Sequence, residues 1–337
     1  MNKKLGFIAM LVSATGMGLV GTFGRLATPV DPATGTKYIT GDFLATGRML
    51  TGALGFLVII LLTHRWQDFR RTRLSFAVVA GGLCIGASLA LYVSSTLMTT
   101  IANAVFLIYT GPLFSALLAR IFLKEPIRKF NALCLLLVFL GMIMTVGLVN
   151  WGPGGLSFGL ELGANPELPN KTIGDLFGLG SGVFYGLALF FYRYRGDIPS
   201  EVRGFWNFIF GAVGALAVMT IRMKTLDPTN PFEVMTSRNW AWAVGMFLVC
   251  GFVAIGLLVV AGKNLLAVEL STTSYWECFV ALVLGAIIWH ESMTAVGAIG
   301  GALILIGGVG PIIYDLVLAP RRKTEIVDTH EPSLGEA

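Results

Sequence analysis

Charged side chains are scarce in this chain of 337 residues: they make up 13% of it, whereas hydrophobic residues make up 55%. A soluble domain carries about 25% charged residues, so the composition excludes an ordinary soluble core and is typical of a membrane protein with several spans. The chain has only three histidines, no G-x-x-x-x-G-K-[ST] phosphate loop and no H-E-x-x-H motif. These absences argue against a histidine metal site and an ATPase domain, and they leave an intramembrane enzyme as a remote alternative. We expect no cofactor.

The four cysteines have no metal-ligand spacing and all fall within apolar segments, so we interpret them as packing residues. The net charge of +5 comes from basic residues that border apolar segments, which argues against a nucleic-acid partner. Residues 1–27 begin with a basic segment like that of a signal peptide. Their apolar stretch is too long and no small-residue cleavage site follows, so we predict an uncleaved first helix.

Apolar runs of about 20 residues, the length that crosses a bilayer, occur ten times. We predict an all-α integral membrane protein with ten transmembrane helices at 5–27, 41–63, 74–97, 103–123, 130–150, 173–193, 204–221, 241–262, 267–289 and 295–318. Lys and Arg favour the cytoplasmic side. With both termini in the cytoplasm of a bacterial cell, the outer segments hold only Lys37, Lys171, Arg222, Lys224 and Arg238. Residues 319–337 are predicted to form a disordered cytoplasmic tail.

The two halves of the chain resemble each other. Residues 6–25 align with 174–193 at an offset of 168, and seven of these twenty positions are identical: Gly6/Gly174, Leu11/Leu179, Ser13/Ser181, Gly18/Gly186, Leu19/Leu187, Phe23/Phe191 and Arg25/Arg193. Three more matches follow at an offset of 166: Tyr109/Tyr275, Glu125/Glu291 and Gly141/Gly307. We assign 1–150 to a first repeat, 151–172 to an outer linker and 173–318 to a second repeat.

Each repeat holds five predicted helices, an odd number, so the second repeat enters the membrane from the opposite side. Inverted repeats are typical of secondary transporters, which bind substrate near mid-membrane between the halves and open alternately to each side. The repeat therefore favours a transporter over a channel, for which the chain also has no selectivity-filter sequence. The oligomeric state, monomer or homodimer, stays open.

A G-x₆-S-x₄-G pattern opens each half, and a carboxylate follows the fourth helix of each half (FLKEP at 122–126, IWHES at 288–292). With the five-plus-five layout, these features make residues 5–318 resemble the drug/metabolite transporter superfamily, in its bacterial EamA-type branch of ten helices. The resemblance implies a basket of helices around a central cavity. It also implies transport of amino acids, amines, nucleotide sugars or other small metabolites. Trp276–Glu277 stands where the first half has Thr110–Gly111, so the role of this carboxylate is argued from physics alone.

Glu277 is the only charged residue in the stretch from Leu270 to Trp289. A carboxylate at the bilayer centre costs about 2.5 kcal/mol or more, so it usually faces a cavity and has a function. Three roles are open. Glu277 binds a cationic group of the substrate, or it carries a proton as coupling ion, or it pairs with a buried arginine as a structural lock.

Polar and aromatic residues of other spans are candidates for the same site. Pro112 frees the carbonyl of Ile108, which suits either a transporter site or a simple packing kink. Aromatic rings near mid-depth form cages for organic cations, but they also gather at membrane interfaces, the favoured interpretation for Tyr92 and Tyr192. We expect Trp276 and Tyr109 to face the cavity. The full candidate set for substrate binding is Glu277, Trp276, Tyr109, Asn103, Tyr185, Tyr92 and Arg48.

Arg48 lies about a third of the way into the second span, where it pairs with Glu277, binds a substrate carboxylate or extends outward to the interface. Arg25 and Arg193 end their helices and are interpreted as boundary anchors. Glu125 and Glu291 are interpreted as caps of the helices that follow them.

The function that these observations favour is secondary transport of small polar metabolites, most of all export of amino acids or related metabolites by alternating access. The alternative is uptake of an amine or a quaternary ammonium compound such as choline, which would use the aromatic faces and Glu277. An inward-facing Arg48 favours a substrate with a carboxylate, whereas an Arg48 that extends to the interface favours the cation.

Overall fold

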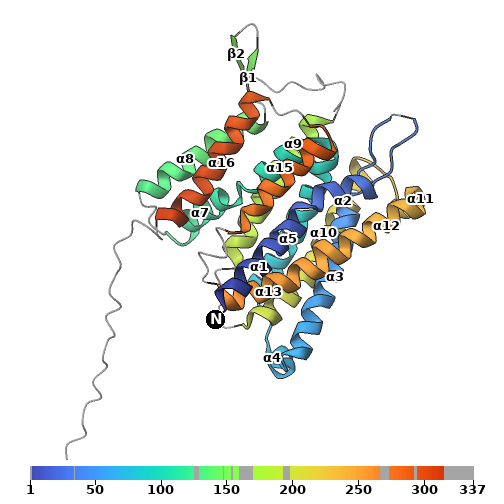
Figure 1. Ribbon diagram of the computed structural model, residues 1–337, viewed down its shortest axis with the longest axis vertical. Coiled ribbons are helices and arrows are strands. Elements are labelled where there is room, and N and C mark those ends of the chain that lie inside the picture. The colour runs from blue at the N-terminus through green and yellow to red at the C-terminus, as the bar shows by residue number, and fades with distance from the viewer. Residues whose placement is uncertain are drawn as a thin grey trace, which may run out of the picture.

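The computed structural model describes residues 2–33, 35–124, 129–146, 148–152, 155–158, 170–192, 198–265, 273–291 and 294–314 (Figure 1). Most of the predicted linker and the whole predicted tail lie outside these residues. The elements of the first repeat are α1 (Lys3–Gly18), α2 (Val20–Ala27), α3 (Gly41–Leu62), α4 (Trp66–Arg71), α5 (Phe76–Met98), α6 (Ile101–Ile108), α7 (Gly111–Phe122) and α8 (Lys129–Val146).

A short antiparallel hairpin of β1 (Val149–Gly152) and β2 (Gly155–Phe158) follows α8, where no strand was expected. The second repeat then contains α9 (Lys171–Phe191), α10 (Ser200–Thr225), α11 (Pro231–Val234), α12 (Ser237–Met246), the π-helix η1 (Phe247–Val253), α13 (Ala254–Asn264), α15 (Trp276–Ile288) and α16 (Ala295–Ile313).

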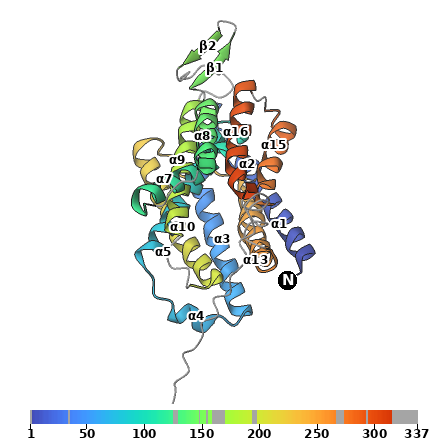
Figure 2. The same ribbon diagram turned by 90° about the vertical axis from the view of Figure 1, so that its left-hand side faces the viewer.

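Seven helical segments in the described residues are long and apolar enough to cross a membrane, and three shorter apolar helices, Lys129–Thr145, Trp276–Ile288 and Ala295–Gly310, accompany them. Together they follow the order of the ten predicted spans, and the predicted all-α membrane fold is confirmed. Both views place the β-hairpin at one end of the bundle and α4 at the other (Figures 1 and 2). We call these ends the hairpin face and the α4 face.

Three of the spans are broken in the described residues where a single helix was expected. The first span divides at Leu19 into α1 and α2, the fourth divides at Tyr109 and Thr110 into α6 and α7, and the ninth is interrupted at Tyr275, just before α15. Pro112 lies in the first turn of α7, where its missing N–H costs no helical hydrogen bond. The proline therefore starts a new helix after the break.

Contacts between the repeats come in matched pairs, as a two-fold relation requires. α1 packs against α13 in the same way as α9 packs against α5, and α1 meets α15 as α9 meets α7. The contact of α3 with η1 is likewise matched by that of α10 with α5. Two pairs, α3 with α10 and α8 with α16, bring together equivalent helices of the two repeats and so lie on the two-fold axis.

The glycines of the G-x₆-S-x₄-G pattern are explained by this packing. A Cβ atom on Gly18 would lie 2.8 Å from Cβ of Val280 and 2.9 Å from the carbonyl oxygen of Glu277. A Cβ atom on Gly186 would lie 2.5 Å from Cβ of Phe114 and 2.7 Å from the carbonyl oxygen of Gly111. Val280 and Phe114 are related by the offset of 166, as are Glu277 and Gly111. The weak sequence match between the halves therefore corresponds to the same close helix crossing in each repeat.

Candidate functional site

The helix breaks of the fourth and ninth spans bring two repeat-related tyrosines together. Tyr109 follows the last residue of α6, and Tyr275 precedes the first residue of α15. Their rings lie 5.3 Å apart, centroid to centroid, at an angle of 34°. Residues on the two-fold axis meet their own counterparts, so the pair marks the centre of the interface between the repeats.

Glu277 lies beside this pair, in the first turn of α15. The hydroxyl of Tyr109 donates a hydrogen bond of 3.2 Å to Oε2 of Glu277. The start of a helix favours negative charge because its backbone N–H groups have no helical partners. Glu277 is partly buried, and the hydrogen bond from Tyr109 holds its carboxylate in place.

Arg48 points into the bundle, and the option that it extends to the interface is wrong: the residue is only 5% exposed. Its Nε donates to the carbonyl oxygen of Cys250 at 3.2 Å, and one terminal nitrogen lies 2.6 Å from Sδ of Met17. Cys250 belongs to η1, and π-helical turns are frequent at functional sites. A guanidinium has five N–H donors, so these two contacts leave others for a ligand.

Arg48 and Glu277 form no direct ion pair in the described part of the chain, although each lies within reach of the other's charge. In the other repeat, Gly111 occupies the position equivalent to Glu277. When the close helix contacts of the two repeats are aligned, Asn207 occupies the position equivalent to Arg48. Neither Arg48 nor Glu277 therefore has a charged counterpart in the other repeat.

Tyr92 and Tyr185 belong to the same apolar cluster as Tyr109 and Tyr275. Tyr92 is 2% exposed, so the favoured interpretation of it as an interface residue is wrong. The ring of Tyr185 lies close to Gly111, where a Cβ atom would meet its Cδ1 at 2.5 Å. None of the described residues hydrogen-bonds the hydroxyl of Tyr92 or Tyr185. Four tyrosines thus belong to one cluster, in which Tyr109 contacts Glu277 and Tyr275 directly.

Trp276 and Asn103 lie apart from this group. The Trp276 side chain is 40% exposed, and its indole N–H donates to the Thr15 hydroxyl at 3.1 Å on the outside of the bundle. Asn103 is buried, and its side-chain amide donates to Oδ1 of Asp175 at 3.2 Å and to the carbonyl of Thr145 at 3.3 Å. Neither side chain contacts Glu277, so the expectation that Trp276 faces a cavity is not met.

The structure adds residues that sequence reasoning missed. Met17 and the η1 carbonyl of Cys250 hold Arg48, and nothing in the local sequence of either residue signals this contact. Tyr275 could have been found, because the repeat aligns it with Tyr109.

Arg25 and Glu291 are interior residues and not the anchor and cap that we expected. Arg25 is buried and forms an ion pair of 2.5 Å with Glu291. Both carboxylate oxygens of Glu291 accept from the backbone N–H of Ile101 at 3.0 Å. Glu291 therefore caps α6 of the first repeat instead of the helix that follows it. Their counterparts Arg193 and Glu125 lie outside the described residues.

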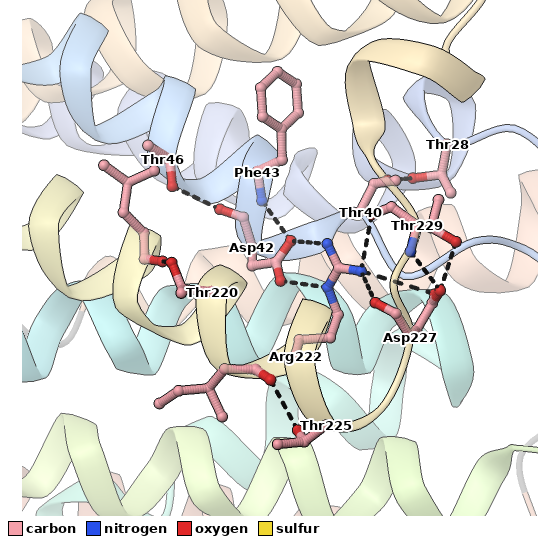
Figure 3. A network of polar contacts seen from close by, with 12 residues as sticks. Thr28, Thr40, Asp42, Phe43, Thr46, Thr220, Arg222, Thr225, Asp227 and Thr229 are labelled. Atoms are coloured by element: carbon pink, nitrogen blue, oxygen red, sulfur yellow. Dashed lines mark hydrogen bonds and ion pairs between the residues drawn. The ribbon is translucent and has the colours of Figure 1, made fainter.

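A second buried ion pair joins the repeats at the hairpin face, between α3 and α10 (Figure 3). Nε and one terminal nitrogen of Arg222 lie 2.7 and 3.4 Å from the two carboxylate oxygens of Asp42. The other terminal nitrogen donates to the carbonyls of Asp227 at 2.8 Å and Thr229 at 3.2 Å. This network orders the segment that connects α10 to α11.

The fold and the site together define a class: a polytopic helical protein built from two repeats, with a charged and aromatic site at their interface. Comparison with known proteins agrees. The model of the EamA-like transporter family matches residues 4–147 and 172–310. The chain belongs to the EamA-like transporter family, and it is a membrane transporter and not an enzyme.

Two relatives extend this result. An uncharacterized transporter from Archaeoglobus fulgidus is 25% identical over 309 residues, which cover 90% of this chain and 95% of that protein. A solved structure, described only as "Crystal structure of protein", matches with a TM-score of 0.55 and 17% identity over 94% of this chain and 98% of that one. The second likeness concerns the fold alone.

Proposed function

We propose that the protein is a secondary transporter that exports amino acids or closely related zwitterionic metabolites by alternating access. The observation that carries the proposal is the inward position of Arg48, which adds a buried cation to a site that also holds Glu277. A zwitterion satisfies both groups: its carboxylate binds Arg48 and its ammonium binds Glu277. The positive charge of Arg48 would repel a purely cationic substrate.

The lack of two-fold symmetry in these charges supports a fixed orientation of the substrate. Arg48 is held by Cys250 and Met17, and Glu277 is held by Tyr109, so neither charged group has to be ordered at the moment of binding. Preorganised groups reduce the entropy cost of association. We further propose a bacterial plasma membrane location with both termini in the cytoplasm, which puts the hairpin face outside.

One observation favours the alternative of an amine or quaternary ammonium substrate. Tyr109 contacts Glu277, three more tyrosines belong to the same apolar cluster as Tyr109, and aromatic faces attract such cations. The two candidate substrates differ in how their binding depends on Arg48. A zwitterion needs the positive charge of Arg48, whereas a cation binds better when that charge is removed.

The test is counterflow in proteoliposomes with neutral amino acids, primary amines and choline. The variants are Glu277→Gln and Arg48→Gln, and the control is Trp276→Phe, which changes an exposed ring of the same span. We expect amino acids to exchange in the wild type and the control and to lose exchange in both variants. Choline exchange that survives Arg48→Gln would establish the alternative. Exchange of none of these compounds by the wild type would refute the proposed substrate class.

Proton coupling is read in the same vesicles. If Glu277 carries the coupling proton, an imposed pH gradient drives net amino-acid movement in the wild type, and the gradient has no effect on Glu277→Gln. If the gradient drives no net movement in the wild type either, Glu277 serves substrate binding alone.

A further inference from the structure

The ion pair of Arg25 and Glu291 is the centre of a larger contact at the hairpin face. Besides its 2.5 Å contact with Glu291, Arg25 donates from Nε to the carbonyl of Thr96 and from a terminal nitrogen to that of Thr99, both at 2.8 Å. Glu291 in turn accepts from the N–H of Ile101. We call Arg25, Glu291 and the Ile101 N–H the clasp. It joins the end of α2, the end of α5 and the start of α6 to the turn after α15.

An aromatic ring covers the clasp. The guanidinium carbon of Arg25 lies 5.3 Å from the centre of the Trp289 ring, and Nζ of Lys37 lies 5.8 Å from it. Lys37 also donates to the carbonyl of Arg25 at 2.7 Å. Burial, and next the positive charge of Arg25, lower the pKa of Lys37. The side chains of Arg25 and Glu291 are 9% and 10% exposed, so the contact is nearly closed to solvent.

The clasp joins the two repeats, because Arg25 and Ile101 belong to the first and Glu291 belongs to the second. Rocking of one repeat against the other changes such contacts, whereas contacts within a repeat move as a unit. Among the described residues, a second ion pair between the repeats at this face, Asp42 with Arg222, joins α3 and α10. The clasp differs from it because it binds the first amide of α6, the helix that leads to Tyr109 and the candidate site, so we take the clasp as the contact that opens.

Two helices connect the clasp to the candidate site. α6 begins at Ile101, whose N–H is bound in the clasp, and is followed by Tyr109, whose hydroxyl is bound to Glu277. Eight residues of helix span about 12 Å. α15 begins with Glu277 in its first turn, and Glu291 follows soon after its end. A shift of either helix therefore reaches both places.

We propose that the clasp is a gate of the transport pathway at the hairpin face, closed in this structure, and that α6 and α15 couple its opening to occupancy of the site at Glu277. The coupling rests on the proposed transport function, but the gate itself does not. A ligand at Glu277 shifts the gate only if it binds the open and closed states with different affinities, and the effect is reciprocal.

Cys278 supplies the reporter for the gate. It is buried, follows Glu277 in α15 and contacts the side chain of Tyr109. A protein that retains only this cysteine is labelled with a membrane-impermeant maleimide, added from each side of oriented vesicles. The variants are Glu291→Gln, which keeps the shape of the side chain, and Arg25→Met. The control is Glu201→Gln, which removes an ion pair with Lys263 that lies wholly within the second repeat.

We expect slow labelling from outside in the parent protein and in Glu201→Gln, and labelling at least about fivefold faster in both clasp variants, as for a coupling of ordinary size. Each variant must elute as a monodisperse peak, and either clasp variant alone suffices if the other does not fold. Unchanged labelling from both sides in a folded clasp variant would overturn the gate.

The coupling has its own measurement, the half-saturating amino-acid concentration in counterflow. We expect it to change severalfold in Glu291→Gln and to stay within twofold in Glu201→Gln. An unchanged value together with faster labelling would leave a gate without coupling and refute that part. If the parent protein transports no amino acid, the proposed function fails, while the labelling experiment still decides the gate.

Discussion

The hydrogen bond from Tyr109 to Glu277 gives the sharpest test of the site, because the repeat provides a matched control. Tyr109→Phe removes one hydroxyl and leaves the ring that packs on Tyr275. A hydrogen bond to a charged group contributes about 1.5–3 kcal/mol. The distance of 3.2 Å is long for a hydroxyl donor, which points to the lower value. We therefore expect a loss of about 1.5 kcal/mol in substrate binding, or roughly tenfold in affinity.

Tyr275→Phe makes the same chemical change at the repeat-related position, where no described residue hydrogen-bonds the hydroxyl. We expect its affinity to stay within about twofold of the wild type, since no bond to a charged group is lost. The assay is counterflow over a range of substrate concentrations, with half-saturation and maximal rate fitted separately. Equal effects of the two substitutions, or no effect of Tyr109→Phe on half-saturation, would refute the assignment of Glu277 as a substrate-binding group positioned by Tyr109.

Two further predictions concern stability, measured as thermal unfolding in detergent. Gly18→Ala puts a methyl group against the neighbouring helix and should destabilise by about 1–3 kcal/mol, whereas Gly256→Ala, which has no neighbour within 4 Å of the new atom, should be neutral or stabilising. A similar loss in both would refute the close crossing at Gly18 as the cause, because the higher helix propensity of Ala predicts no loss at Gly256. Asp42→Asn removes the closer charge partner of the buried Arg222 and leaves Asp227 at 3.9 Å, so it should cost about 3 kcal/mol, while Asp68→Asn at an exposed pair should cost less than about 1 kcal/mol. Equal losses would contradict the buried network.

Parts of the site could be predicted from the sequence, but its assembly could not. Glu277 and Tyr109 were both candidates from the sequence, because a charge at mid-depth and an aromatic ring at mid-depth are local signals. Their hydrogen bond joins residues 168 positions apart, and no local pattern records it. Trp276 was expected to face the cavity but is exposed, because aromatic character at the right depth does not tell which side of a helix faces the bundle.

Arg25 and Glu291 show the same limit for the clasp. The repeat marked both positions, and helix ends usually hold anchors and caps, so a local role was the natural interpretation. The fold instead brings the two side chains together from different repeats and turns Glu291 to the first amide of α6. A cap binds whichever free N–H groups lie nearest in space, and those need not belong to the next helix.

The sequence by itself determined the number and order of the spans, the internal repeat and the class of protein, because long apolar runs and glycine spacing follow from the bilayer and from close helix crossing. The tertiary structure alone decided that Arg48 faces inward, that Tyr109 and Tyr275 pack together, and that Arg25 of the first repeat pairs with Glu291 of the second. The physical reason is that the bilayer acts on every residue of a span alike. The partner of each polar side chain is set by helices that are distant in sequence and adjacent only after folding.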